Sequence, residues 1–355
     1  MVLLYISADK ISDSTGGGIV VKNESAAFTE FAGELDGCRE VLVCTDTLMT
    51  EAGPFHQDET ILKEVQEGLK GRVPQLVHCY SGCLTKTCEW LKSIGSRISY
   101  TIAAHDKKVS QREHEKIGLP FPYPHLTQED LWEKYIGGYR ASDVIIVPGT
   151  VPERTVRGYG KDFENKNIQI IPHGCDLPEQ IKPVPKQFVV GMLGSMGMDK
   201  GARYLLEAWK KLAYRDSILT IGGRDSVSDY GKGLISTFGG GNLWIRGWMN
   251  SVTDFYNSIS LLVCPAATEG FNIEVIEAMG HGRAVLCSDA AGAVDLVPDK
   301  WKVPACVVDV LANKIHEAKE RWDLGVEGRI GRGIAEGLTW DNIKEKYKAV
   351  WRAMA

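Results

Sequence analysis

Two glutamates separated by seven residues have the clearest capacity for chemistry in this chain. Glu269 follows an apolar run at 259–264 that is typical of a strand, and Glu277 lies about two turns into the helix predicted over 272–280. Ligands bind where the strands of an open parallel sheet end, and the free N–H groups at the start of the next helix suit a phosphate. Two carboxylates there could hold sugar or ribose hydroxyls beside a bound diphosphate.

A simpler interpretation treats the same carboxylates as solvated charges on a helix. Glu274 lies between the two glutamates, and Gly280 and Gly282 are ordinary residues for a helix end. A short motif alone does not separate these two interpretations. The segments that would surround the helix therefore have to be considered with it.

Two features of the second half of the chain could serve the same ligand. A glycine-rich turn after the strand-like run 188–193 carries Lys200, which places an ammonium group at a strand end. Trp248 follows another strand-like run, at 242–246, and a core aromatic is one interpretation of it.

The first half of the chain has glycines and a histidine at two predicted strand ends. Consecutive glycines that include Gly17 and Gly18 follow the run 2–7 and precede a helical pattern, so their N–H groups could approach an anion closely. His105 follows the run 99–103. A single histidine is usually structural, but its place at a strand end makes a functional role equally plausible.

These residues need parallel sheets to position them, and the sequence predicts two. Short apolar runs alternate with helical patterns, which is typical of βαβ units in an α/β fold. The strands expected in the first half are 2–7, 41–45, 75–79, 99–103, 143–147 and 168–171. Those expected in the second half are 188–193, 217–222, 242–246, 259–264, 284–288 and 305–309. The proline-rich segment 172–187 breaks both patterns, and an amphipathic helix over 339–355 ends the chain.

Composition limits the class of protein. The 355 residues favour two domains, and the net charge of −5 argues against an extended nucleic-acid surface. The nine cysteines are an odd number, several lie in apolar runs, and they indicate reduced thiols in a reducing compartment. We find neither a signal peptide nor a membrane-spanning run, so we expect a cytoplasmic protein with at most peripheral membrane contact.

The segment Glu269-Gly270-Phe271-Asn272-x4-Glu277 resembles the Glu-x7-Glu signature of the retaining GT-B glycosyltransferases of family 4. The resemblance is strong over roughly 188–300. It implies a GT-B fold, with two doubly wound Rossmann-like domains facing across a cleft. The expected ranges are 1–172 for an acceptor-side domain, with helix 339–355 packed back on it, and 173–338 for the donor domain.

The resemblance also implies roles for individual residues. The catalytic residues would be Glu269, His105 and Lys200. The donor-binding residues would be Gly17, Gly18, Ser195, Lys200, Trp248, Gly270, Phe271, Asn272 and Glu277. Ser195 departs from the family, which usually has an arginine there, and Arg203 or Arg224 could supply the missing charge. Lys200 matches the family's diphosphate-binding lysine, and Trp248 lies in a segment that resembles the family's loop around the nucleobase.

The implied activity is that of a hexosyltransferase. A nucleoside-diphosphate sugar is the expected donor, the acceptor is an unidentified glycan, lipid or small molecule, and the anomeric configuration would be retained. Neither a cofactor nor a metal ion is expected. The sequence contains three cysteines at 79, 83 and 88, but without the spacing of a structural zinc site.

Other functions remain open. Gly191, Gly194 and Gly197 resemble a dinucleotide fingerprint, so an NAD-dependent oxidoreductase is one alternative, with Asp225 as a displaced ribose-binding acid. A non-transferase GT-B enzyme, such as a sugar-nucleotide epimerase, is another. A carbohydrate-binding homologue without activity is the third.

Overall fold

The computed structural model describes residues 2–7, 16–35, 40–45, 54–104, 106–116, 118, 121, 128–223, 228–249 and 251–355. The chain forms two compact units. Unit 1 consists of Met1–Lys107, Phe121–His173 and Trp340–Ala355, and unit 2 consists of Lys108–Pro120 and Gly174–Thr339. The expected domain ranges differ from these by one residue at each junction and by the segment 108–120.

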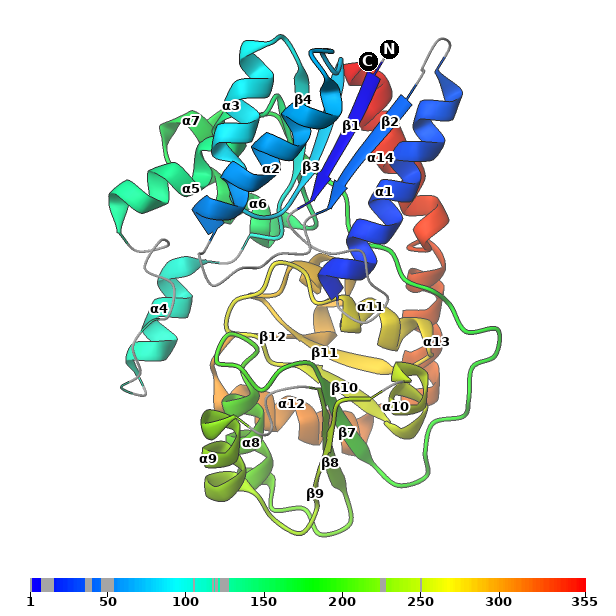
Figure 1. The fold of residues 1–355 in the computed structure, drawn as a ribbon. Helices are drawn as coiled ribbons and strands as arrows, with labels where there is room; N and C mark the ends of the chain where they lie inside the picture. The colour runs from blue at the N-terminus through cyan, green and yellow to red at the C-terminus, as the bar shows by residue number, and fades with distance from the viewer. Residues whose placement is uncertain are drawn as a thin grey trace. The chain divides into compact units, whose positions relative to one another are not determined.

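Unit 1 is built on a parallel sheet in the strand order β2-β1-β3-β4-β5-β6 (Figure 1). Its strands are β1 (Val2–Ser7), β2 (Glu40–Thr45), β3 (Leu76–Tyr80), β4 (Arg97–Thr101), β5 (Val144–Val147) and β6 (Ile168–Ile170). Its helices are α1 (Gly16–Glu34), α2 (Pro54–Leu69), α3 (Thr85–Ser93), α5 (Glu129–Ala141), α6 (Thr150–Arg157), α7 (Lys161–Glu164) and α14 (Trp340–Met354). Helix α4 (Lys107–Glu115) begins at the junction with unit 2.

The last helix of the chain, α14, belongs to unit 1. Its buried residues Ile343, Tyr347, Trp351 and Met354 recur at helical spacing, which explains why this segment forms an amphipathic helix. In Figure 1, α14 lies beside α1, and the ring of Trp351 meets the ring of Phe28 edge-on at 4.9 Å between centroids. The two ends of the chain therefore share one core.

Unit 2 is built on a second parallel sheet, in the order β12-β11-β10-β7-β8-β9. Its strands are β7 (Val189–Leu193), β8 (Ile218–Gly222), β9 (Leu243–Gly247), β10 (Leu261–Cys264), β11 (Ala284–Ser288) and β12 (Lys302–Val303). Its α-helices are α8 (Ala202–Leu212), α9 (Asp229–Phe238), α10 (Val252–Ser258), α11 (Ile273–Gly280), α12 (Val308–Arg321) and α13 (Leu324–Glu336), and its 3₁₀ helices are η2 (Gly292–Leu296) and η3 (Asp299–Trp301). Central strands such as β10 and β11 are buried throughout, as expected of a parallel sheet covered on both faces.

The predicted strands match the observed ones to within two residues at either end, with one exception. The strand predicted over 305–309 is wrong, because the last strand is β12 at Lys302–Val303 and α12 begins at Val308. The valines at 307 and 308 favour a strand locally. The buried residues Leu311, Ala312 and Ile315 follow at helical spacing, and this longer pattern sets the structure.

Candidate active site

The strand order of unit 2 places β7 and β10 side by side. The chain reverses its direction of travel across the sheet between these strands, and ligands of open α/β sheets bind at such a switch point. Lys200 follows β7 and Glu269 follows β10. The two segments are joined where the N–H groups of Ala267 and Thr268 donate to the carbonyl oxygen of Asp199, at 2.8 and 3.3 Å.

Gly201 fixes the turn that carries Lys200. Its φ is 71°, and a Cβ atom there would lie 2.0 Å from the carbonyl oxygen of Pro265. Both the left-handed backbone and the lack of space require glycine. The absence of a side chain thus allows the segment after β7 to approach the end of β10.

The ammonium group of Lys200 lies between two carboxylates. Its Nζ is 2.7 Å from Oε2 of Glu269 and 3.7 Å from Oε1 of Glu274, and the three side chains are 25%, 13% and 12% exposed, respectively. Burial lowers the pKa of Lys200, but the charges of Glu274 and Glu269 outweigh burial and hold this pKa above its ordinary value. Lys200 is therefore a fixed positive charge at the switch point.

Helix α11 begins directly beside this cluster. Asn272, with φ of 77°, makes no capping hydrogen bond with its side chain. Its Nδ2 instead donates to Oε1 of Glu274 at 2.7 Å, and the N–H of Gly270 donates to Oε1 of Glu269 at 3.3 Å. A helix start without a side-chain cap can bind an anion through its first N–H groups.

Glu277 is held by a tyrosine from α10. The hydroxyl of Tyr256, whose side chain is fully buried, donates to Oε2 of Glu277 at 2.6 Å. Burial raises the pKa of Glu277 to about 7, although the hydrogen bond from Tyr256 lowers it in part. Glu277 and Glu274 are thus both partly or fully buried, and their interpretation as solvated helix charges is wrong.

The edge that carries Lys200 extends to Trp248. The N–H of Gly194 donates to the carbonyl oxygen of Gly222 at 2.9 Å, and that of Gly223 donates to Gly247 at 2.7 Å. Trp248 follows directly and is 49% exposed. This exposure favours a stacking surface over a core aromatic at this position.

No second cation completes the site among the residues that the structure describes. The hydroxyl of Ser195 accepts a hydrogen bond from the N–H of Gly197 at 3.4 Å. Arg203 is engaged with Glu207 at 2.6 Å, and Arg224 lies outside the described residues.

The site residues predicted in the first half of the chain are Gly17, Gly18 and His105. Gly17 and Gly18 lie in the first turn of α1. The first N–H groups of a helix have no intrahelical acceptor, so binding of the donor by Gly17 and Gly18 stays a prediction. His105 lies outside the described residues.

The dinucleotide fingerprint is not favoured by its local structure. Gly191 lies inside β7, where a Cβ atom would meet the side chain of Ile259 at 2.7 Å, so this glycine serves the packing of the strand. Asp225 lies outside the described residues. Within the described part of the chain, no group of three or more His, Cys, Asp or Glu side chains could hold a metal ion, and no helix has the length and apolar character to cross a membrane.

The sequence did not indicate the contact of Tyr256 with Glu277, nor that Lys200 is shared by Glu269 and Glu274. Tyr256 resembles any core aromatic of an amphipathic helix, and nothing local connects it to Glu277, which lies 21 positions later. The pairing of Lys200 with Glu274 likewise needs the tertiary contact between the ends of two strands.

The comparisons agree with this geometry. Residues 187–320 match the family model described as Glycosyl transferases group 1. The relative MJ1607, an uncharacterized glycosyltransferase of Methanocaldococcus jannaschii, is 25% identical over 170 residues, which cover 45% of this chain and 43% of that protein. The chain spans less than half the length of the curated relatives it matches.

Solved structures extend the likeness to the whole chain. Sucrose-phosphate synthase from Thermosynechococcus elongatus has a TM-score of 0.79 at 18% identity, over 99% of this chain and 98% of that one. Anabaena Alr3699/HepE in complex with UDP has a TM-score of 0.72 at 15% identity, over 99% and 100% of the two chains. The chain therefore has the GT-B fold of glycosyltransferases.

Proposed function

We propose that this chain is a glycosyltransferase that moves a sugar from a nucleoside-diphosphate sugar to an acceptor hydroxyl and retains the anomeric configuration. The observation that carries the proposal is the contact of 2.7 Å between Lys200 and Glu269 at the switch point of unit 2. The matched family model spans both residues. The structure of Alr3699/HepE contains UDP, which supports a nucleotide-sugar donor.

The donor would lie along the edge of the sheet in unit 2. Lys200 and the start of α11 would bind the diphosphate, and Trp248 would stack on the base. Glu277, fixed by Tyr256, would accept hydrogen bonds from the ribose hydroxyls, and Glu269 would orient the sugar. The ion pair of Lys200 with Glu269, the hydrogen bond of Tyr256 to Glu277 and the exposure of Trp248 support these roles.

The reaction would break the bond between C1 of the sugar and the leaving phosphate oxygen, with the electron pair passing to the diphosphate. The acceptor oxygen would bond to C1 on the same face, and its proton would pass to the diphosphate. Negative charge grows on the leaving group, so fixed positive charge there stabilises the transition state most. Lys200 and the helix start would supply this charge without a metal ion.

We also propose that the enzyme acts in the cytoplasm. The seven cysteines whose side chains the structure describes are free thiols, as expected in a reducing compartment. All of them except Cys306 are buried, where they pack as small hydrophobic residues of the core.

A ligand screen tests the proposed function. A molecule that binds only the folded state must raise the unfolding temperature, so UDP, GDP and ADP would be compared with NADH. The nucleotide that stabilises the protein would then be offered as its sugars, and release of nucleoside diphosphate would be measured. NMR of the product reports its anomeric configuration. Stabilisation by NADH alone, or an inverted product, would contradict the proposal in its class or in its stereochemistry, respectively.

A further inference from the structure

Glu274 is an acidic residue inside the proposed diphosphate site. It lies in the first turn of α11, where a carboxylate ordinarily favours the helix dipole. A carboxylate that serves only this purpose would be solvated. Glu274 is instead 9% exposed as a residue, and its Oε1 faces the Lys200 ammonium at 3.7 Å.

Two contacts hold the Glu274 carboxylate in this place. Asn272 donates to Oε1 at 2.7 Å, and this bond fixes the carboxylate beside the helix start. A Cβ atom at Gly194 would lie 4.0 Å from the same oxygen and 4.0 Å from Cε of Lys200. The carboxylate therefore reaches the glycine turn after β7, where a phosphate group would approach the lysine.

The charges of the cluster do not suit an incoming anion. Lys200 contributes one positive charge, whereas Glu269 and Glu274 are both paired with it. Ser195 adds no charge, and Arg203 is engaged with Glu207. A nucleoside diphosphate must therefore approach a lysine that two carboxylates already neutralise.

We propose that Glu274 competes with the donor diphosphate for Lys200, and so weakens nucleoside-diphosphate binding and speeds its release after transfer. This inference rests on the proposed function. In the free protein the ammonium group is shared by Glu269 and Glu274. When the diphosphate binds, Lys200 exchanges its longer contact, with Glu274, for a phosphate oxygen. Product release reverses this exchange, and product release limits turnover in many enzymes.

The variant Glu274→Gln tests the competition. The amide keeps the size of the side chain and an oxygen for Asn272, but it removes the negative charge. Calorimetry should show tighter binding of the stabilising nucleoside diphosphate, by about fivefold or more, because one like charge about 4 Å away has an effect of that size even at the dielectric of water. Binding of the corresponding nucleoside, which has no phosphate, should not change.

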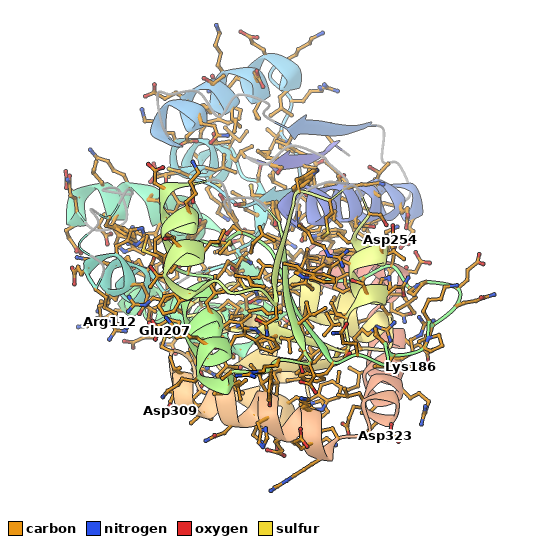
Figure 2. The ribbon with its side chains drawn as sticks, turned by 90° about the horizontal axis from the view of Figure 1, so that it is seen from below. Arg112, Lys186, Glu207, Asp254, Asp309 and Asp323 are labelled. Atoms are coloured by element: carbon orange, nitrogen blue, oxygen red, sulfur yellow. The ribbon has the colours of Figure 1, made fainter. Side chains whose placement is uncertain are left out.

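Asp254→Asn is the matched control. Asp254, labelled in Figure 2, is also the acidic residue in the first turn of a helix, α10, but it is exposed, and the ion pairs of Lys200 are with Glu269 and Glu274. Loss of this carboxylate makes the net charge less negative by the same amount, so the variant corrects for general electrostatics and for loss of a first-turn carboxylate. Nucleoside-diphosphate binding by Asp254→Asn should equal that of the unaltered protein.

The outcomes separate the inference from the function on which it rests. Tighter diphosphate binding in Glu274→Gln alone supports the competition. Unchanged or weaker diphosphate binding in Glu274→Gln, with an unaltered protein that does bind, overturns the inference and leaves the proposed function standing. Weaker binding of the nucleotide sugar with unchanged nucleoside-diphosphate binding overturns it too, and assigns Glu274 to the sugar. An unaltered protein that binds no nucleotide overturns both.

Discussion

Single residues set the charge of the candidate site, and Glu277 shows how burial and a hydrogen bond oppose each other. Burial raises the pKa of this carboxyl to about 7, and the Tyr256 hydroxyl moderates the rise. The folded protein therefore holds the proton more tightly than the unfolded chain does. The contribution of Glu277 to the free energy of unfolding is accordingly greatest below pH 4.5 and declines as pH rises toward 7.

We predict that the donor KM depends on pH through this group. Ribose hydroxyls donate to an ionised carboxylate, so the KM should fall as pH rises through about 7, while kcat changes less because ribose is remote from the reacting bond. Tyr256→Phe removes the hydrogen bond that lowers the pKa, and should move the midpoint of the KM profile to higher pH. Steady-state kinetics across neutral pH measure both. A midpoint that stays unchanged in Tyr256→Phe would contradict the role of Tyr256.

We predict that transition-state stabilisation depends on the charge of Lys200. Lys200→Ala removes the charge expected to stabilise the leaving diphosphate, and leaves Glu269 and Glu274 without their ammonium partner. We expect kcat/KM to fall by about 2–4 kcal/mol of transition-state stabilisation. Lys200→Arg keeps the charge and should recover part of the loss. Turnover that is unaffected in Lys200→Ala would remove Lys200 from the site.

Helices and strands could be predicted from sequence where the pattern of apolar residues along the chain matches the pattern of burial in the fold. The buried runs of β1, β7 and β11 are apolar because a parallel sheet is covered on both faces, so their ends could be found within a residue or two. The strand predicted over 305–309 is wrong because the packing of α12 outweighs the strand preference of the valines at 307 and 308. The motif around Glu269 was visible because strand, turn and helix follow one another directly. The contact of Tyr256 with Glu277 was not, since only the fold brings α10 and α11 together.

Gly201 allows the segment after β7 to pack closely against the segment after β10. Gly201→Ala would place a Cβ atom against the Pro265 carbonyl in a left-handed backbone, so we expect a loss of about 1–3 kcal/mol or more in the free energy of unfolding and weaker nucleotide binding. Gly233→Ala is the control, because that exposed glycine of α9 has nothing within 4 Å and alanine should stabilise the helix by about 1 kcal/mol. Denaturant unfolding of both variants measures the difference. Equal stability would show that the turn is not constrained.

The whole molecule is assembled so that unit 1 contains both ends of the chain and unit 2 lies between them in sequence. A series of buried hydrogen bonds connects α14, at the end of the chain, to β4, β3 and α1. The indole N–H of Trp351 donates to Ser99 Oγ at 3.2 Å, Ser99 is hydrogen-bonded to His78 Nδ1 at 2.8 Å, and His78 Nε2 lies 2.9 Å from Glu24 Oε2. Trp351 is itself fully buried and donates into this network, so α14 is part of the unit 1 core.

We predict that the stability of unit 1, but not that of unit 2, depends on Trp351. Trp351→Ala removes a fully buried side chain, so unit 1 should lose about 3–5 kcal/mol of its free energy of unfolding. Trp351→Phe keeps an aromatic ring and removes the indole N–H that donates to Ser99, so its loss should be smaller. Calorimetry should then resolve two unfolding transitions, because domains with separate cores need not unfold together. The nucleotide that binds unit 2 should raise only the transition that Trp351→Ala leaves unchanged. Trp244→Ala, which alters a tryptophan that is 49% exposed on β9, serves as the control and should move neither transition greatly. If Trp351→Ala lowers the same transition that nucleotide raises, the two units unfold as one and α14 stabilises the whole chain.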